Sequence, residues 1–327
     1  MLGGTIFVGR HFVEAARLRG HIVTILHRGQ RGADLFPDID RILADRDGGL
    51  PNFGERTWDA VVDCCGYVPR VVRQSAKALA DRVDKYLFIS TVSVYNATDR
   101  AGIDESAPVG TLADKAIEEI TGETYGPLKA LCEEEVSKVF GERALIVRPG
   151  LIVGPYDPTN RFTYWVDRFA NNNKVLVPDL WRQPLQLIDA RDLAQWMIYG
   201  LTVGLNGVFN ATGPEEPKTF GDLVKACLSL NPEARAINGP LAQLEKTDVS
   251  LWSDLPLTIP PGSDLENTLR LNVCKAVREG LTFRPWGESA KDVLDWLRGP
   301  ERKPEKPAYG MTREKELAVL QNLGLRA

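Results

Sequence analysis

The segment LGGTIFVGRHFVEAA, residues 2–16, decides how the chain is expected to fold. An apolar start, a glycine-rich turn and a helix-like stretch follow one another, which is the order that a dinucleotide pyrophosphate requires. Gly3, Gly4 and Gly9 permit a tight turn and close backbone approach, and the following helix presents free N–H groups and its positive end. The segment therefore predicts a dinucleotide-binding turn, with a plain strand-to-helix turn as the alternative.

Two features of this segment depart from that pattern. Ile6 stands where a second glycine often approaches the phosphates, so its Cβ is expected to push a pyrophosphate outward. Only Met1 and Leu2 precede Gly3, whereas a strand usually has about five residues. Either the true reading frame starts upstream, or the first strand is truncated and the cofactor site is weakened.

The rest of the N-terminal half alternates apolar, strand-like runs with segments of helical spacing. Repeated strand–helix–strand units predict an α/β fold, a doubly wound parallel sheet of Rossmann type with a smaller C-terminal substrate lobe. Ligands of such a fold sit at the carboxyl ends of the strands. Strands are expected at 21–29, 58–65, 85–95 and 143–150, and helices at 9–20, 68–83 and 125–139.

Beyond residue 151 the pattern becomes less regular, which sets the expected domain boundaries. Residues 1–150 are predicted to form the dinucleotide-binding domain. The stretch 184–213 reads as a strand, a helix and one more strand, and is expected to return to that domain. Residues 151–183 and 214–327 are then the substrate lobe and the C-terminal tail.

Composition limits the classes of partner and compartment. The 327 residues are 43% hydrophobic and carry a net charge of −4, so nucleic acid is not the expected partner. No basic-then-apolar leader and no apolar run of about 18 residues occurs, so neither export nor a membrane is expected and the chain is predicted to be cytoplasmic.

Cysteine and histidine usage argues against several kinds of site. The five cysteines lack any C-x-x-C spacing, which fits reduced thiols better than a disulfide frame or a zinc site. All three histidines lie between His11 and His27, and no G-x-S-x-G elbow is present. A serine hydrolase and a histidine-rich metal site are therefore both disfavoured, and no metal is expected.

The end of the second strand bears on the choice of cofactor. An NAD binder usually carries an acid there for the ribose 2′-hydroxyl, whereas an arginine suits a 2′-phosphate. This strand ends in ILHRGQR, with Arg28 and Arg31 and no acid. NADP is therefore favoured and NAD stays open, unless these arginines are merely solvated loop cations.

The segment TYGPLKALCEEE, residues 124–135, places Tyr125 four positions before Lys129. On a helix, residues four apart share one face, so both side chains can reach one reacting atom. Pro127 is compatible with a helix that begins close to Tyr125, because proline is tolerated in a first turn. A surface helix with a half-buried tyrosine and a solvated lysine is the alternative.

Taken in order, these segments resemble the extended short-chain dehydrogenase/reductase superfamily, in particular its NAD-dependent epimerase/dehydratase group. FISTVSVY (88–95) is similar to the group's strand before the active site, and YGPLKALCEE (125–134) to its Tyr-x-x-x-Lys element. RPGLIVGP (148–155) is similar to its nicotinamide-side loop, and LQLIDARDLA (185–194) to its late strand. Ile6 makes the chain similar to the atypical branch, which includes reductases and RNA-associated proteins.

The resemblance implies roles for particular residues. Tyr125 would be the general acid/base, Lys129 its activator and a ribose ligand, and Thr91 the hydroxyl that orients the substrate oxygen. A free phenol has a pKa near 10, so a nearby positive charge is needed before it can act as a base at neutral pH. The expected cofactor contacts are Gly3, Gly4, Thr5, Phe7, Gly9, Arg28, Asp45, Cys65, Gly66, Lys129 and Pro149.

Substrate contacts are expected from the second lobe. The stretch 155–168 combines cationic and aromatic side chains at Arg161, Tyr164 and Trp165, and Ser93 is added from the first lobe. This mixture suits a sugar nucleotide or an aromatic, anionic small molecule. Spacing alone does not reject the alternative that Tyr164 and Trp165 belong to a helix core.

Two functions remain open. The first is an NAD(P)-dependent oxidoreductase or epimerase that transfers hydride at a carbonyl or hydroxyl carbon of a small or sugar-nucleotide substrate. Val92 and Ser93 replace the acidic pair that the family's dehydratases carry after this threonine, which disfavours dehydration. The second is a non-catalytic dinucleotide-binding or RNA-associated regulatory protein of the same fold. The resemblance also implies a homodimer.

Overall fold

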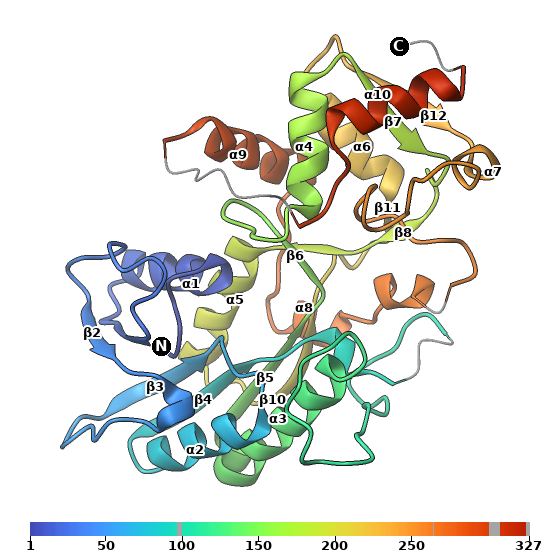
Figure 1. Cartoon of the computed structure of the whole chain (residues 1–327). Coiled ribbons are helices and arrows are strands. Elements are labelled where there is room, and N and C mark those ends of the chain that lie inside the picture. Colours follow the sequence, from blue (N-terminus) through green and yellow to red (C-terminus); the bar gives the residue numbers. More distant parts are fainter. Residues whose placement is uncertain (97–99, 264, 301–307, 325–327) are drawn as a thin grey trace.

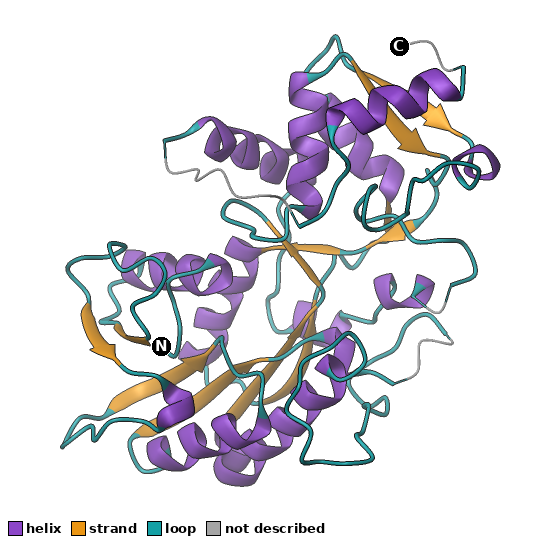
Figure 2. Ribbon diagram, in the orientation of Figure 1, coloured by secondary structure: helices purple, strands orange, loops and turns teal. Residues whose placement is uncertain are grey.

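The computed structural model describes residues 1–96, 100–263, 265–300 and 308–324. Four parallel strands form the centre of the first lobe, in the order β10-β5-β4-β3 (Figures 1 and 2). Their bounds are β3 Trp58–Asp63, β4 Val83–Ile89, β5 Ala144–Pro149 and β10 Gly207–Ala211. This arrangement confirms the predicted doubly wound, Rossmann-like parallel sheet.

Two more strands continue the sheet beyond β3. Strand β1 (Thr24–His27) pairs in parallel with β2 (Asp40–Leu43). Among the described residues, the position between β1 and β3 is occupied by the start of the chain, where Leu2 forms isolated parallel bridges to Leu26 and Asp63. The strand that leads into the glycine turn is thus reduced to a single bridged residue in the described structure.

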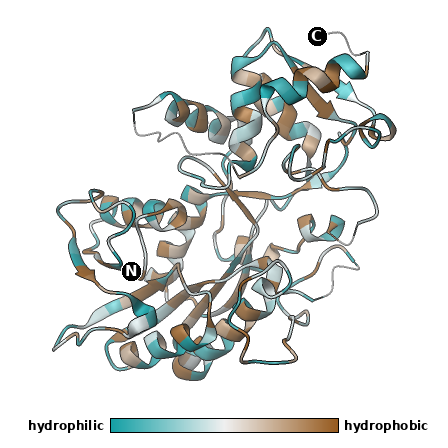
Figure 3. Cartoon of the chain, viewed as in Figure 1, coloured by the Kyte–Doolittle hydropathy of each residue, from teal (hydrophilic) through white to brown (hydrophobic). Residues whose placement is uncertain are grey.

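Helices cover both faces of this sheet. Helices α1 (Phe7–Leu18) and α5 (Ala190–Thr202) pack together on one face, and α2 (Pro69–Leu79) and α3 (Tyr125–Phe140) on the other (Figure 1). The strands carry hydrophobic residues toward both layers (Figure 3). Because two cores flank one sheet, the loops at the carboxyl ends of the strands are held at fixed positions.

A second lobe has its own hydrophobic core and lies over those loops (Figure 1). Its main helices are α4 (Arg161–Asn171), α6 (Phe220–Leu228), α9 (Trp286–Arg298) and α10 (Arg313–Asn322). Short strand pairs, helices and turns complete the described chain. They are β6 (Leu151–Val153) with β9 (Leu187–Asp189), β7 (Lys174–Pro178) with β12 (Arg235–Gly239), β8 (Pro184–Leu185) with β11 (Lys218–Thr219), α7 (Leu241–Leu244), α8 (Cys274–Arg278), and the 3-10 turns η1 (Arg46–Gly48), η2 (Val92–Val94), η3 (Gly141–Arg143) and η4 (Glu266–Leu269).

Most expected elements are found, with one difference that bears on the site. The expected strand over 85–95 ends at Ile89, and η2 follows it. The helix expected from Tyr125 begins there, with Pro127 in its first turn. The proline- and charge-rich stretch 299–310 lies partly outside the described residues. Within the described part of the chain, every helix is too short or too polar to span a bilayer.

Candidate active site

A cleft of about 840 Å³ lies at the carboxyl ends of the strands. This is where open α/β sheets bind their ligands. The glycine turn, the start of α3 and segments of the second lobe all line it. Of the residues predicted from the sequence, it is lined by Gly3, Gly4, Thr5, Phe7, Gly9, Arg28, Cys65, Thr91, Ser93, Tyr125, Lys129, Pro149 and Arg161.

The glycine turn has the backbone shape that the sequence requires. Gly3 and Gly4 have φ angles of 88° and 106°, a region that side chains with a Cβ rarely adopt. A Cβ on Gly9 would lie 2.8 Å from the Cα of Gly4, so helix α1 packs directly on the turn. Helix α1 begins at Phe7 without any side-chain cap at Ile6. The first turn of α1 lines the cleft, and the free N–H groups at such a helix start fit an anionic group such as a pyrophosphate.

Ile6 projects into the same part of the cleft. Its side chain is 44% exposed and lines the cleft beside the start of α1. Phe7, which follows it, has a φ angle of 36°, a strained value for an aromatic residue. A glycine at position 6 would leave the part of the cleft next to the start of α1 open to a ligand, whereas the Ile6 side chain narrows it.

Arg28 is the charged group at the end of β1. It is exposed and lines the cleft, whereas Arg31 is exposed outside it. In a dinucleotide-binding fold, an arginine at the position of Arg28, directly after β1, is in place for a charged group on the cofactor ribose. His27 is buried beside it, and burial, with the Arg41 charge, lowers its pKa.

Tyr125 and Thr91 meet on the opposite wall. The Thr91 side chain acts to lower the pKa of the Tyr125 phenol, and the Thr91 hydroxyl donates to that of Ser93 at 3.1 Å. All three line the cleft; Thr91 and Ser93 reach it because strand β4 ends before them and the chain turns through η2, and Tyr125 reaches it from the start of α3. Helix α3 comes very close here, since a Cβ on Gly126 would lie 2.0 Å from the Ser93 carbonyl oxygen. The first turn of α3 is thereby fixed against the loop that carries Thr91.

Three influences set the proton affinity of Tyr125. Burial raises the pKa of its phenol, while the Thr91 hydrogen bond and the Arg161 charge act in the opposite direction. The net shift is upward. Tyr125 is therefore protonated at neutral pH and can donate a proton to an oxygen in the cleft.

Lys129 lies deeper than the sequence suggested. Its ammonium donates to the backbone oxygens of Gly66 at 2.6 Å and Ile89 at 2.7 Å, and it sits 4.1 Å from the centre of the Phe88 ring. Burial lowers its pKa from 10.5 to about 8, although nearby thiols and carboxylates oppose the shift. Lys129 thus ties α3 to the ends of β3 and β4, and the charge felt by Tyr125 comes from Arg161.

Four predicted residues are not among those that line the cleft. Tyr164 and Trp165 lie in the core of the second lobe, 5% and 0% exposed, so their expected contact with substrate is wrong and the alternative of a helix core holds. Asp45 caps η1 through the Asp47 N–H. Gly66 contributes its carbonyl to Lys129.

Other cleft residues carried no signal in the sequence. Trp252 and Ile259 reach the cleft from irregular segments of the second lobe, and Leu269 from the end of η4. Neither spacing nor a motif marks these residues in the sequence. Thr212 follows β10, and its buried hydroxyl has no hydrogen-bond partner among the described residues. In the same part of the chain, no group of three or more His, Cys, Asp and Glu side chains is arranged to hold a metal ion.

Comparison with known proteins supports the family that the sequence motifs suggested. Residues 68–211 match the model of the NAD dependent epimerase/dehydratase family. The resemblance to this family is confirmed. The matched region contains Thr91, Tyr125 and Lys129, while the glycine turn with Ile6 lies before it. The prediction of an enzyme agrees with the family's description. No curated protein matches the chain.

Solved structures agree in fold. A putative epimerase from Burkholderia cenocepacia J2315 is 18% identical, with a TM-score of 0.68 over 91% of this chain and 96% of that one. The Bordetella bronchiseptica enzyme WbmH, in complex with NAD+, is 14% identical, with a TM-score of 0.65 over 92% and 98%. A UDP-N-acetylglucosamine 4-epimerase from Bacillus cereus is 15% identical, with a TM-score of 0.61 over 93% and 97%. At these identities the likeness shows a shared fold.

The lowered pKa of Lys129 predicts how stability changes with pH. Between about pH 8 and pH 10.5 the unfolded chain holds a proton on Lys129 that the folded chain has released. Stability therefore rises with pH in this window. The free energy of unfolding of the wild type, measured by urea denaturation relative to Lys129→Met, should rise by about 1 to 2 kcal/mol from pH 8 to pH 9.5.

Lys85→Met is the matched control, because Lys85 also donates to a backbone oxygen, that of Gly204, from a half-buried position. The same pH dependence relative to both variants would contradict the prediction.

Proposed function

We propose that the protein is an NAD(P)-dependent oxidoreductase or epimerase that acts on a carbonyl or hydroxyl carbon. One observation carries the proposal: the Tyr125 phenol and the Thr91 hydroxyl, which acts on its pKa, lie in the same cleft as the glycine turn and Lys129. A proton donor, a second hydroxyl and a pyrophosphate-sized turn in one cleft fit the needs of nicotinamide chemistry. A bound nicotinamide would supply the hydride transfer.

In the proposed mechanism the substrate oxygen lies between Thr91 and Tyr125. Thr91 holds this oxygen by a hydrogen bond, and the protonated phenol of Tyr125 donates a proton to it as the carbon is reduced. In the reverse direction Tyr125 must accept the proton, which requires further positive charge because burial holds its pKa up. Arg161 already acts in that direction.

The cofactor is proposed to lie along the glycine turn. The uncapped start of α1 would hold the pyrophosphate, Cys65 and Pro149 would border the cofactor, and Arg28 would meet the ribose at the adenine end. The family's description and the WbmH structure name NAD. Arg28, with no acid at the end of β1, supports NADP as the preferred form.

The substrate is proposed to enter from the second lobe. Arg161 at the start of α4 offers a guanidinium to a carboxylate or phosphate, and Ser93 offers a hydroxyl next to Thr91. A sugar nucleotide, of the kind for which the Bacillus cereus 4-epimerase is named, and a smaller carbonyl compound both fit this description. The proposed division keeps residues 1–150 and 184–213 for the cofactor, and 151–183 and 214–327 for the substrate lobe and tail.

One observation favours a non-catalytic, dinucleotide-sensing role as the second candidate. Ile6 narrows the approach to the start of α1, which weakens the case for a tightly held cofactor. The proton-donor pair favours catalysis. Turnover therefore separates the two candidates.

Replacement of Tyr125 tests the proposed proton transfer. Tyr125→Phe removes the hydroxyl and keeps the ring, so turnover of a carbonyl panel with NADPH should fall by about two to four orders of magnitude. Cofactor affinity, measured by tryptophan fluorescence, should stay within about twofold, a change below 0.5 kcal/mol. Tyr67→Phe is the control, since Tyr67 also lines the cleft. Near-normal turnover by Tyr125→Phe would exclude the assignment.

Replacement of Arg28 tests the cofactor preference. Arg28→Ala should weaken NADPH binding about ten- to hundredfold, because a charge-assisted hydrogen bond to the 2′-phosphate is lost. NADH binding should change little. Arg31→Ala, on the same loop but outside the cleft, should leave both affinities unchanged. Equal losses for NADPH and NADH in Arg28→Ala would rule out a role in selection.

Replacement of Arg161 tests the anionic substrate contact. Once a substrate is found in the panel, Arg161→Ala should raise its KM about tenfold or more, since a guanidinium–anion pair is removed. Arg182→Ala is the control, because Arg182 does not line the cleft. An unchanged KM in Arg161→Ala would assign Arg161 to the packing of the second lobe.

A further inference from the structure

The part of the cleft that the second lobe forms has mainly apolar walls. Trp252, Ile259 and Leu269 line it, together with Leu265 just before η4. The Leu265 side chain is 53% exposed, so a large apolar surface is open to a ligand. An apolar ligand group that covers these walls gains from the burial of apolar surface, whereas the hydroxyls of a sugar would lose their hydrogen bonds to water.

Polar side chains in this part of the cleft already have partners. The Gln186 amide is bonded to the backbone of Leu271 through both its oxygen and its nitrogen, at 2.9 and 3.0 Å. The Thr268 hydroxyl donates to Leu265 O at 2.6 Å. A sugar or a nucleobase would have to compete for these groups, because a buried polar group needs hydrogen bonds of its own.

Arg161 supplies the positive charge of this part of the cleft. The other two cationic side chains that line the cleft serve elsewhere. Arg28 follows β1 on the proposed cofactor side, and the Lys129 ammonium donates to the backbone oxygens of Gly66 and Ile89. A nucleoside diphosphate carries a negative charge on each phosphate, so a single guanidinium would leave part of that charge unpaired. A single carboxylate would be fully paired.

The guanidinium of Arg161 is held in place with its outer nitrogens available. Its Nε donates to the Thr159 hydroxyl at 3.1 Å, and that hydroxyl donates to the buried Asp157 carboxyl at 2.7 Å. The guanidinium carbon lies 5.8 Å from the centre of the Trp252 ring and 5.7 Å from that of Tyr309. Within the described residues, neither Nη nitrogen of Arg161 has a hydrogen-bond partner. This planar pair of nitrogens matches the two oxygens of a carboxylate.

Arg161 also lies near the group that would move the proton. Its charge acts on the phenol of Tyr125 and lowers the pKa of that phenol. An anion bound to Arg161 is therefore close to the oxygen that Tyr125 would protonate. The carboxylate of the ligand must then be only a few bonds from its carbonyl carbon.

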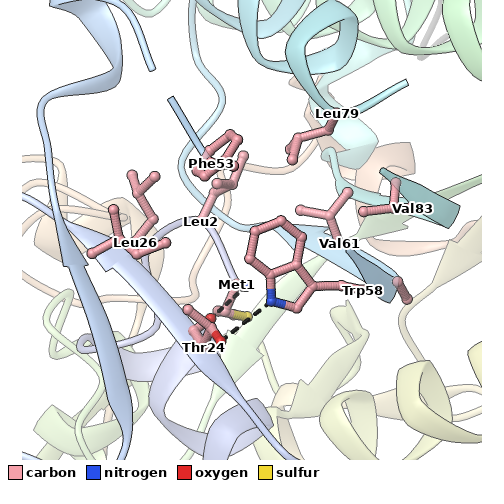
Figure 4. A pocket seen from close by; sticks show the side chains of 11 residues that line it. Met1, Leu2, Thr24, Leu26, Phe53, Trp58, Val61, Leu79 and Val83 are labelled. Atoms are coloured by element: carbon pink, nitrogen blue, oxygen red, sulfur yellow. Dashed lines mark hydrogen bonds between the residues drawn. The ribbon is translucent and has the colours of Figure 1, made fainter. Parts of the chain in front are cut away.

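A smaller apolar hollow beside β1 and β3 is too small for such a ligand (Figure 4). Leu26, Phe53 and Trp58 line it, and the Trp58 Nε1 donates to the Thr24 hydroxyl at 3.3 Å. Its volume is about 30 Å³, against about 840 Å³ for the cleft. This is room for about one water molecule, so an organic ligand fits the cleft and not this hollow.

We propose that the substrate is a carbonyl compound with an apolar body and one carboxylate close to the carbonyl carbon, and that Arg161 selects it by this carboxylate. The inference rests on the proposed function and narrows its substrate. Reduction of such a compound moves a hydride from the reduced nicotinamide to the carbonyl carbon and a proton from Tyr125 to its oxygen. The products are a hydroxy acid and the oxidised cofactor, and water restores the proton on Tyr125.

Binding of four compounds by the full chain, with and without NADP+, tests the proposal. Isothermal titration calorimetry compares 4-phenyl-2-oxobutanoate with its methyl ester, with 2-oxoglutarate and with UDP-glucose. The phenyl keto acid should bind about tenfold or more tightly than its ester, because the ester lacks the charge that pairs with Arg161. It should also bind at least about tenfold more tightly than 2-oxoglutarate, which lacks the apolar body, and than UDP-glucose.

Two variants connect this preference to the cleft. Arg161→Met should lower the affinity for the phenyl keto acid to that for its ester and leave the ester unchanged, which a purely structural role would not produce. Leu265→Ser should weaken binding of the phenyl keto acid about fivefold and leave that of 2-oxoglutarate unchanged, because an apolar contact is lost. Leu18→Ser is the matched control and should change neither, since Leu18 is 89% exposed and lies outside the cleft.

Equal binding of the phenyl keto acid and its ester, or UDP-glucose binding as tight as that of the phenyl keto acid, would overturn the proposal. A chain that binds none of the four compounds would do the same. Turnover separates this inference from the proposed function. Binding of the phenyl keto acid without its reduction by NADPH would support the ligand class and contradict the proposed function, whereas turnover of UDP-glucose alone would support the proposed function and contradict this inference.

Discussion

A buried ion pair between Glu133 and Arg148 fixes helix α3 against the sheet, and the candidate site depends on that placement. Two nitrogens of Arg148 bind the two carboxylate oxygens of Glu133 at 2.9 and 2.6 Å. Ser90 donates to the same carboxylate, and Arg148 also donates to the Tyr95 hydroxyl. Removing one partner of a buried pair typically costs about 3 to 5 kcal/mol, so the register of α3 is strongly held.

The fixed register of α3 also places the residues that precede Glu133 on this helix. Lys129 lies one turn before Glu133, and Tyr125 lies one turn before Lys129, so all three point toward the ends of the strands. A second buried pair lies at the end of β3, where Arg46 binds both oxygens of Asp63 and the Tyr86 hydroxyl donates to the same carboxylate. Asp63 precedes the segment whose Gly66 carbonyl receives Lys129. The carboxylates of both pairs act on the ammonium of Lys129, and both oppose the lowering of its pKa by burial.

The fold and part of the candidate site could be predicted from the sequence, and the reasons lie in which features are local along the chain. Apolar, strand-like runs and helical spacing are local properties, so the strands β1, β3, β4, β5 and β10 and the start of α3 at Tyr125 could be predicted. Which face of a helix meets a lobe core is not local, and spacing could not show that Trp165 turns inward. Lys129 binds backbone oxygens, which every residue has, so no pattern of side chains marks its partners.

The electrostatics of the cleft separate the two directions of proton transfer. Burial holds the phenol of Tyr125 in its neutral form, and the ammonium of Lys129 donates to the backbone oxygens of Gly66 and Ile89. Of the positive groups in the cleft, Arg161 is the one that acts on Tyr125, and it comes from the other lobe. Under the proposed function, proton donation would need only the first lobe, whereas proton abstraction would need charge brought by the second lobe or by an oxidised nicotinamide. Under the proposed function, a site with this charge arrangement would favour proton donation, and hence reduction, over proton abstraction.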